Sequence, residues 1–187
     1  MQTAFFEHLN NHKPAQGRET ESLAKMHRFI ETDGDNLFCR SNQKGHFTAS
    51  AWVVNGQMDK VLLVHHKKLK AWLQPGGHAD GSDDILAMAQ QEVWEETGIK
   101  DTKLGLEGIF DVDAHNIPEA PKNGVLEPAH VHYDIRYLLI ADDSIPLKVS
   151  DESHDVKWFD LNEANKANPW LERMIEKTKK LKEDKEG

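Results

Sequence analysis

The sequence predicts an α/β (α+β) fold in which helices cover a mixed β-sheet on two faces. Two observations indicate it. Apolar runs typical of strands stand both before and after one central helical segment, and amphipathic helical patterns occupy both ends of the chain. The length of 187 residues corresponds to about one domain with terminal additions.

The ends of the chain are expected to be helical. Residues 1–44 contain two short helical patterns and are expected to form an N-terminal helical extension. Residues 45–187 then form the main domain, which includes a C-terminal helix. Asn168 and Pro169 supply the cap and the first-turn proline of that helix. Its apolar stripe is expected to consist of Trp170, Leu171, Met174, Ile175 and Leu181.

Five strands are expected between the terminal helices. The first two, residues 47–54 and 60–66, are joined as a hairpin by the turn signal Asn55-Gly56. Loops are expected where proline and glycine gather, at residues 73–84 and 118–128. The central helix begins after Asp84 and ends before Gly98, which has the position of a C-terminal cap. The remaining strands are expected at residues 104–112, 130–140 and 155–159.

Composition and charge exclude several classes of protein. The chain has 23 Lys and Arg against 32 Asp and Glu, and the resulting net charge of -9 argues against a general nucleic-acid groove. No apolar run approaches the roughly 20 residues that a membrane-spanning helix needs. Cys39 is the single cysteine, so no internal disulfide can form. Together with the lack of a secretory signal pattern, this predicts a cytoplasmic protein.

The central helix carries three glutamates on one face. Glu92, Glu95 and Glu96 stand at positions i, i+3 and i+4. Like charges at these spacings destabilise an isolated helix, whereas a hard cation such as Mg2+ or Mn2+ needs such oxygen ligands. The preceding Pro-Gly-Gly loop can approach a ligand closely because glycine has no side chain. A metal site is therefore favoured over the alternative, a solvated acidic face.

The stretch from Gly77 to Ile99 resembles the Nudix box. That motif reads glycine, five residues, glutamate, seven residues, then Arg-Glu-hydrophobic-any-Glu-Glu-any-Gly-hydrophobic. Five of the seven fixed residues match, namely Gly77, Glu92, Glu95, Glu96 and Gly98. The departures are Asp83 for the box glutamate and Gln91 for the box arginine. These two family residues pair, so here an Asp83–Gln91 hydrogen bond would replace an ion pair.

The resemblance implies a fold, a reaction and a set of site residues. The fold is the Nudix-type α/β/α sandwich with a mixed sheet. The reaction is hydrolysis of a phosphoric anhydride, the pyrophosphate linkage of a small nucleoside diphosphate derivative, with Mg2+ or Mn2+ as cofactor. The resemblance assigns the metal to Glu92, Glu95, Glu96 and the backbone carbonyl of Gly76. It assigns the general base to Glu92 or Glu152.

A second polar group alternates along the expected strand of residues 130–140. Four residues share one face because they stand at every second position: His130, His132, Asp134 and Arg136. Residues 111–115 repeat the alternation on what we expect to be a neighbouring strand. Such a face indicates a phosphate or metal pocket, and the alternative is a solvent-facing side of the sheet. We expect these four residues, with His78 beside the glycine loop, to bind the substrate.

Two other classes of function remain open. A non-catalytic Nudix-like module would sense a nucleotide without cleaving it, although a sensor need not keep Glu92, Glu95 and Glu96. A histidine-metal module would use the strand of His130, His132 and Asp134 as its main site. Tightly held zinc or iron would favour the histidines, and weak Mg2+ or Mn2+ dependence the carboxylates.

The substrate and the oligomeric state are less determined. The SQPWPFP-type motif of NADH-cleaving relatives is absent. No tyrosine lies between Asp111 and Ala120, where dinucleoside polyphosphate relatives carry one. A nucleoside diphosphate sugar is favoured on the breadth of the family alone. The terminal helices leave a homodimer open.

Overall fold

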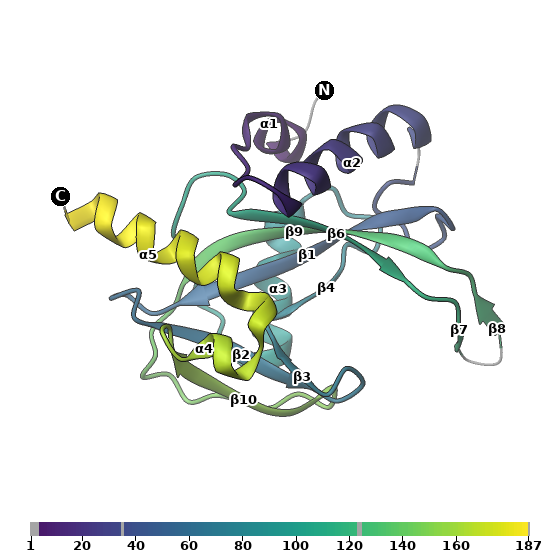
Figure 1. Cartoon of the computed structure of the whole chain (residues 1–187). Helices are drawn as coiled ribbons and strands as arrows, with labels where there is room; N and C mark the ends of the chain where they lie inside the picture. The colour runs from purple at the N-terminus through teal and green to yellow at the C-terminus, as the bar shows by residue number, and fades with distance from the viewer. Residues whose placement is uncertain (1–3, 35, 123–124, 187) are drawn as a thin grey trace. The chain divides into compact units, whose positions relative to one another are not determined.

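The computed structural model describes residues 4–34, 36–122 and 125–186 and has a mixed α+β architecture (Figure 1). Its contacts divide the chain into two compact units. Unit 1 contains the described residues up to Ser50, with Gly77–Met88 and Gly108–Arg136. Unit 2 contains Ala51–Gly76, Ala89–Glu107 and the described residues from Tyr137 on. Four elements contribute residues to both units: β1 (Gly45–Val54), β4 (Gly76–His78), α3 (Ile85–Thr97) and β9 (His130–Ile140).

Unit 2 is built on a sheet with the strand order β10-β2-β1-β9-β5. β2 (Lys60–His66) pairs antiparallel with β1, with Val53 opposite Leu62, and this confirms the expected hairpin. On its other side β2 pairs with β10 (Ser153–Asp160). The short β3 (Ala71–Leu73) pairs with Val64–His66 of β2, on the edge that faces β1. β5 (Lys103–Leu104) pairs with β9. The apolar residues of β1 and β2 form the core of the unit.

The C-terminal helices complete unit 2. They are α4 (Ala164–Ala167), the 3-10 turn η1 (Pro169–Leu171) and α5 (Glu172–Glu186). Asn168 caps η1 as expected, because its side chain accepts a hydrogen bond from the backbone N–H of Trp170 at 3.0 Å. α5 is tied to β1 by the indole N–H of Trp52, which donates to Thr178 at 2.8 Å.

Unit 1 is built on β9, β6 and the first half of β1. β6 (Asp111–Ile117) pairs antiparallel with β9, which confirms that the two alternating polar segments are neighbours. Two helices occupy the N-terminal part as expected, α1 (Ala4–Asn11) and α2 (Arg18–Asp33). α2 packs on β6, and the hydroxyl of Ser22 accepts a hydrogen bond from the backbone N–H of Ala114. The ring of Phe29 stacks on Tyr133 with centroids 4.4 Å apart.

β1 and β9 run parallel as neighbours in both units. In unit 1 the N–H of Val131 donates to the carbonyl of Lys44, and in unit 2 the N–H of Ala141 donates to Val54. The strands approach most closely at Gly45. A Cβ atom there would lie 2.5 Å from the carbonyl oxygen of Val131 and 2.9 Å from the Tyr133 ring. Only glycine fits this close approach of two backbones.

α3 begins and ends as its sequence predicts. The Asp84 carboxylate accepts a hydrogen bond from the backbone N–H of Ala87 at 3.1 Å and caps the first turn. Gly98 follows the last turn with a φ of +81°, and its N–H donates to the carbonyl of Trp94. The face carrying Ala89 and Val93 is buried.

Three of the expected elements are wrong in part. Residues 104–112 are not one strand, because Gly105 packs against Leu138 and Gly108 takes a φ of +84°, so the chain turns between β5 and β6. The expected loop of residues 118–128 contains the hairpin strands β7 (Ala120–Lys122) and β8 (Val125–Glu127). The expected loop of residues 73–84 contains β4 (Gly76–His78), which pairs with β1.

The C-terminal stripe also differs at one position. Leu171, Met174 and Ile175 are buried as expected and Leu181 is half-buried, but Trp170, on the 3-10 turn before the regular helix, is 73% exposed. Among the described residues, no helix combines the length and the apolar character that a membrane span requires.

Candidate functional site

Unit 2 brings the predicted metal and catalytic residues together. Glu92, Glu95 and Glu96 lie on the second half of α3 as expected. Glu96 is the buried member of the three, at 7% exposure. One oxygen of its carboxylate accepts a hydrogen bond of 3.0 Å from the backbone N–H of Gly76. This bond holds the glycine loop against the helix at the position that the sequence predicts for a ligand carbonyl.

The Glu96 carboxylate carries a strongly perturbed pKa. Burial, the largest cause, raises the pKa of Glu96 to about 7, and the hydrogen bond from Gly76 opposes this shift. The negative charges of Glu92, Glu152 and Glu95 raise the pKa further. Four carboxylates therefore influence one another, including Glu152 at the loop before β10. A cation held by these oxygens would relieve both the burial and the repulsion.

The two departures from the motif have different surroundings. The amide of Gln91 donates a hydrogen bond of 2.7 Å to the carboxylate of Glu95, one turn further along α3. An arginine at position 91 would carry a positive charge there, whereas glutamine adds none. Asp83 lies in the loop immediately before the capping residue Asp84. The predicted Asp83–Gln91 hydrogen bond stays a prediction.

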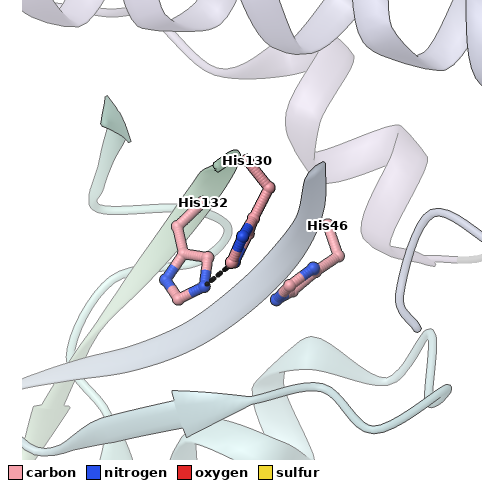
Figure 2. Close-up of side chains that lie close together, drawn as sticks. All are labelled: His46, His130 and His132. Atoms are coloured by element: carbon pink, nitrogen blue, oxygen red, sulfur yellow. Dashed lines mark hydrogen bonds between the residues drawn. The ribbon is translucent and has the colours of Figure 1, made fainter. Parts of the chain in front are cut away.

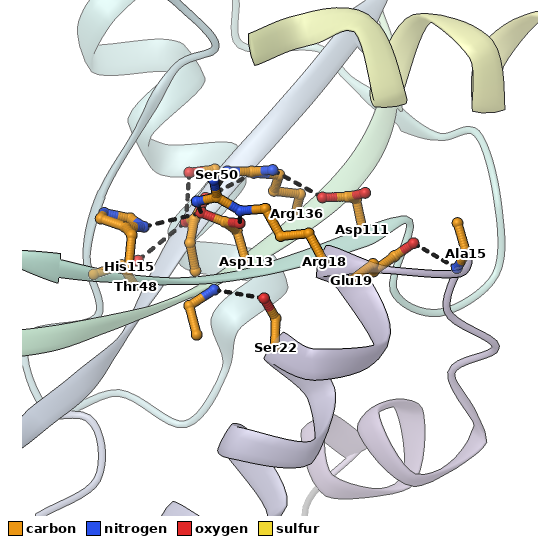
Figure 3. Close-up of polar contacts among 12 residues, drawn as sticks. Ala15, Arg18, Glu19, Ser22, Thr48, Ser50, Asp111, Asp113, His115 and Arg136 are labelled. Atoms are coloured by element: carbon orange, nitrogen blue, oxygen red, sulfur yellow. Dashed lines mark hydrogen bonds and ion pairs between the residues drawn. The ribbon is translucent and has the colours of Figure 1, made fainter.

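Unit 1 contains all the predicted substrate-binding residues, and two of them belong to a network of buried charges (Figure 3). The guanidinium of Arg136 donates to Asp134 and to Asp111, at 2.8 Å each. Asp134 also accepts hydrogen bonds from the hydroxyls of Thr48 and Ser50. Burial tends to lower the pKa of Arg136, but the aspartates outweigh it and raise the pKa above its usual value.

The network continues to helix α2 through Asp113. Arg18 donates two hydrogen bonds to the Asp113 carboxylate, at 2.6 and 3.0 Å, and His115 Nδ1 lies 3.1 Å from it. Burial alone would raise the pKa of Asp113, but His115, Arg18 and Arg136 overcome it and lower the pKa well below its usual range. This face of the sheet is therefore not the solvent-facing side that was the alternative.

Histidines gather at the other end of the same face. The rings of His46, His130 and His132 lie together, as Figure 2 shows, with His130 Nε2 3.2 Å from His132 Nε2. The His78 ring on β4 has its centroid 5.2 Å from that of His46 and 5.1 Å from that of His132. His115 lies 5.6 Å from His132 by the same measure. The predicted residues His78, His130 and His132 are thus brought together.

Burial and neighbouring histidines lower the pKa of two of these residues, His46 and His132, and so favour their neutral form. Burial, the largest cause, lowers the pKa of His46 to about 4, and His130 lowers it further. Burial likewise lowers the pKa of His132 to about 2, with additional contributions from His46 and His78. Neutral imidazoles offer a lone pair at one ring nitrogen and are the form in which histidine binds metals.

Sequence reasoning missed His46. β1 is buried along its whole length, and its apolar residues make it resemble a purely apolar strand. Polar residues nevertheless stand at every second position, namely His46, Thr48 and Ser50. These three residues face the polar side of β9, where Asp134 accepts from both hydroxyls. The alternation of polar residues within an apolar strand is the signal that would have found it.

Comparison with known families and proteins gives consistent matches. The family model of the NUDIX domain matches residues 44–178. A Xenopus laevis protein called nucleoside diphosphate-linked moiety X motif 6 is 38% identical over 86 residues, which are 43% of this chain and 39% of that protein. The asymmetrical bis(5'-nucleosyl)-tetraphosphatase of Mus musculus is 26% identical over 111 residues, 59% of this chain and 69% of the relative. The chain thus spans about two fifths of the frog relative.

Solved structures share the fold. A NUDIX hydrolase from Nitrosomonas europaea superposes with a TM-score of 0.51 at 20% identity, covering 74% of this chain and 91% of that one. A binary complex of the C. elegans Ap4A hydrolase gives a TM-score of 0.50 at 18% identity, over 72% of this chain and 93% of the other. At these identities the likeness establishes the architecture and no more.

Proposed function

Because the chain belongs to the NUDIX domain family, we propose that it is a divalent-metal-dependent pyrophosphohydrolase acting on a nucleoside diphosphate derivative. One observation carries the proposal. The buried Glu96 carboxylate has its pKa raised to about 7 among three further carboxylates. Burial is the largest cause of this shift and the neighbouring carboxylates add to it. A purely structural helix face has no reason to combine the two, whereas a site for a cation does.

The donor set fits Mg2+ or Mn2+. Carboxylate and carbonyl oxygens are the ligands that these hard ions prefer, and Glu92, Glu95, Glu96 and the carbonyl of Gly76 would supply them. The Gly76–Glu96 hydrogen bond keeps the glycine backbone beside the ligand carboxylate. When bound, the metal neutralises phosphate charge and lowers the pKa of a water molecule.

The proton transfer from the attacking water requires a side chain of the protein. A general base must take a proton from the attacking water, and we assign it to Glu92 or to Glu152. Glu152 lies close enough to raise the pKa of Glu96, and its position on an exposed loop leaves it accessible. Glu92 is half-buried on the helix itself. Substitution of each by glutamine identifies the base by the loss of the acidic limb of the pH–rate profile.

Two classes of substrate have support. A nucleoside diphosphate sugar remains our first choice. A dinucleoside polyphosphate is the second candidate, because the mouse relative is named as a bis(5'-nucleosyl)-tetraphosphatase. Its weakness is the absence of a tyrosine between Asp111 and Ala120. We place His78, His130, His132, Asp134 and Arg136 near the substrate as a prediction, although Asp134 and Arg136 already satisfy each other.

The test is hydrolysis of a panel of both classes with Mg2+ or Mn2+ and with EDTA as control. We expect metal-dependent turnover of at least one compound, and loss of turnover by more than about 1000-fold in Glu96→Gln, because the variant removes one ligand charge. The amide still accepts the hydrogen bond from Gly76, so the fold persists. Glu183→Gln, an exposed glutamate on α5, is the matched control and should retain full activity.

Two outcomes would contradict the proposal. Undiminished turnover in Glu96→Gln would remove the carboxylates from the reaction. Binding of nucleotides without turnover of any compound would favour the alternative, a nucleotide-sensing module. In that case, restoring Asp83→Glu and Gln91→Arg together is the next experiment, since these two positions depart from the motif.

A further inference from the structure

Three histidines of unit 1 converge in a way that neither the metal ligands nor the general base of the proposed hydrolysis accounts for. His46 comes from β1, and His130 and His132 come from β9, its parallel neighbour. One nitrogen from each ring lies within 4.8 Å of the other two, and the rings lie close together (Figure 2). We call these three residues the histidine site.

The hydrogen bonding of His130 indicates which of its nitrogens carries the lone pair, the one that accepts from His132 Nε2. Its Nδ1 lies 2.8 Å from the backbone carbonyl oxygen of Pro128. A carbonyl only accepts, so Nδ1 must carry the proton and Nε2 must carry the lone pair. Histidines that bind metals commonly donate their other ring N–H to a backbone carbonyl in this way, which fixes both tautomer and ring orientation.

The spacing of the two β9 nitrogens matches a shared ion. His130 Nε2 and His132 Nε2 are 3.2 Å apart. Two nitrogens bound to one tetrahedral zinc ion at about 2.0–2.1 Å lie roughly 3.3–3.4 Å from each other. The pair is therefore already close to ligand spacing. To bind an ion, His132 must move the proton that it donates to His130 from Nε2 to Nδ1, and the His46 nitrogen, within 4.8 Å of the others, must come closer.

His46 supplies the independent observation. It is 1% exposed, and neither of its ring nitrogens makes a hydrogen bond of normal geometry among the described residues. A backbone group of Asn42 lies near enough to raise the pKa of His46 slightly, without reaching that geometry. Burying an imidazole with unsatisfied nitrogens costs free energy, and a bound ion would satisfy one of them.

We propose that His46, His130 and His132 together bind one transition-metal ion, with Zn2+ as the fitting ion. Imidazole nitrogens suit zinc and its neighbours, whereas Mg2+ and Mn2+ prefer oxygen ligands, so this ion differs from that of the carboxylates. Three histidines leave a fourth coordination position, as in zinc sites that keep a water molecule. The His78 ring is about as close to His46 and His132 as they are to each other, so it lies beside the site.

The site gives His130 and His132 a role other than substrate contact. Its ligands come from two neighbouring strands, so the ion would cross-link β1 and β9 within unit 1. The proposal stands on the histidine geometry alone and does not depend on the hydrolase activity. Failure of one proposal therefore leaves the other intact.

Zinc binding to the full chain tests the proposal directly. The protein is treated with EDTA, freed of the chelator and titrated with Zn2+ in a calorimeter near neutral pH. We expect one tight site per chain. His46→Asn and His132→Asn should each weaken it by more than about 100-fold. The matched control His154→Asn, an exposed strand histidine outside the site, should bind as the unmodified chain does, and so should Glu96→Gln.

A second measurement needs no variant. Co2+ in a four-coordinate nitrogen site absorbs visible light much more strongly than six-coordinate Co2+, and Zn2+ should displace it and abolish the absorption. Zinc binding that survives both histidine substitutions but disappears in Glu96→Gln would overturn the proposal. A weak six-coordinate cobalt spectrum would overturn it as well, even if the histidine variants fail to fold.

Discussion

At the residue scale, the most constrained charges of the molecule are those of Arg136 and Asp113. A buried charge is stable only where partners replace the lost water. Arg136 has Asp111 and Asp134 at 2.8 Å, and Asp113 has two hydrogen bonds from Arg18. These charged residues are therefore already paired with one another, and they contribute first to the stability of unit 1.

Asp113→Asn tests this network. The variant loses the ion pair with Arg18 and leaves the positive charge of Arg136 less compensated, so we expect a loss of about 2–4 kcal/mol in the free energy of unfolding at neutral pH. The estimate is below the usual value for a fully buried pair because Arg18 is 45% exposed. Urea denaturation of both proteins measures it. Asp101→Asn, an exposed aspartate, is the control and should change little.

The same pair predicts a pH dependence of defined sign. The pKa of Asp113 is lower in the folded state than its ordinary value of 3.8. Its stabilisation is therefore complete above pH 3.8 and is lost as the pH falls towards the folded pKa. The stability difference between the unmodified chain and Asp113→Asn should shrink as the pH falls below 3.8. A difference that stays constant would show that the carboxylate charge is not the cause.

Most residues of the two candidate sites could be predicted from the sequence, but His46 could not. Glu92, Glu95 and Glu96 share a helix, so spacing alone places them together. His130 and His132 share a strand and were identified for the same reason. His46 is separated from them by more than eighty residues, and only the parallel pairing of β1 with β9 brings it near. No local pattern encodes that pairing.

At the element scale, the contact between β1 and β9 depends on Gly45. A methyl group there would meet a backbone carbonyl at 2.5 Å, and a backbone cannot yield as a flexible side chain can. We expect Gly45→Ala to destabilise the protein by about 1–3 kcal/mol, the usual cost of overpacking. Thermal unfolding followed by circular dichroism measures the effect.

A glycine elsewhere provides the comparison. A Cβ atom at Gly56 would meet nothing within 4 Å. Gly56→Ala should therefore leave the melting temperature close to that of the unmodified chain. Equal effects of the two substitutions would mean that the strand spacing adapts, and that Gly45 is not needed for the close approach.

Elements with long, regular patterns were predictable and short ones were not. The hairpin of β1 and β2, the strand of residues 130–140 and helix α3 follow from continuous or alternating apolar residues. β4, β7 and β8 have three residues each, too few for any periodicity. Their pairing comes from tertiary contacts, and Gly105 and Gly108 interrupt residues 104–112 for the same kind of reason.

At the scale of the whole molecule, the N-terminal residues are an integral part of unit 1. Arg18 pairs with Asp113, Ser22 bonds to β6, and Phe29 stacks on Tyr133. The predicted boundary between an extension of residues 1–44 and a domain of residues 45–187 stays a prediction. So do the cytoplasmic location and the homodimer.

Removal of residues 1–44 should therefore abolish cooperative unfolding of unit 1. The truncated chain would expose the Tyr133 face and leave Asp113 without Arg18. Calorimetry of the truncated and the full chain is the measurement. Within the full chain, Phe29→Ala should lower the free energy of unfolding by about 3–5 kcal/mol, and Arg18→Ala should lower it clearly less. A truncated chain that unfolds at the temperature of the full chain would make residues 1–44 a dispensable extension.

The parallel pairing of β1 with β9 also determines when the protein can fold. Hydrogen bonds join residues 44 and 131 at one end and 54 and 141 at the other. During synthesis, β1 emerges early and waits with one edge unpaired until β9 has been made. Pairing between strands that are distant in the sequence slows folding, and until it forms, the apolar strand β1 can pair with other chains. The yield of folded protein from a cell should consequently depend strongly on translation speed and growth temperature. The free energy of unfolding of the finished protein does not determine that yield alone.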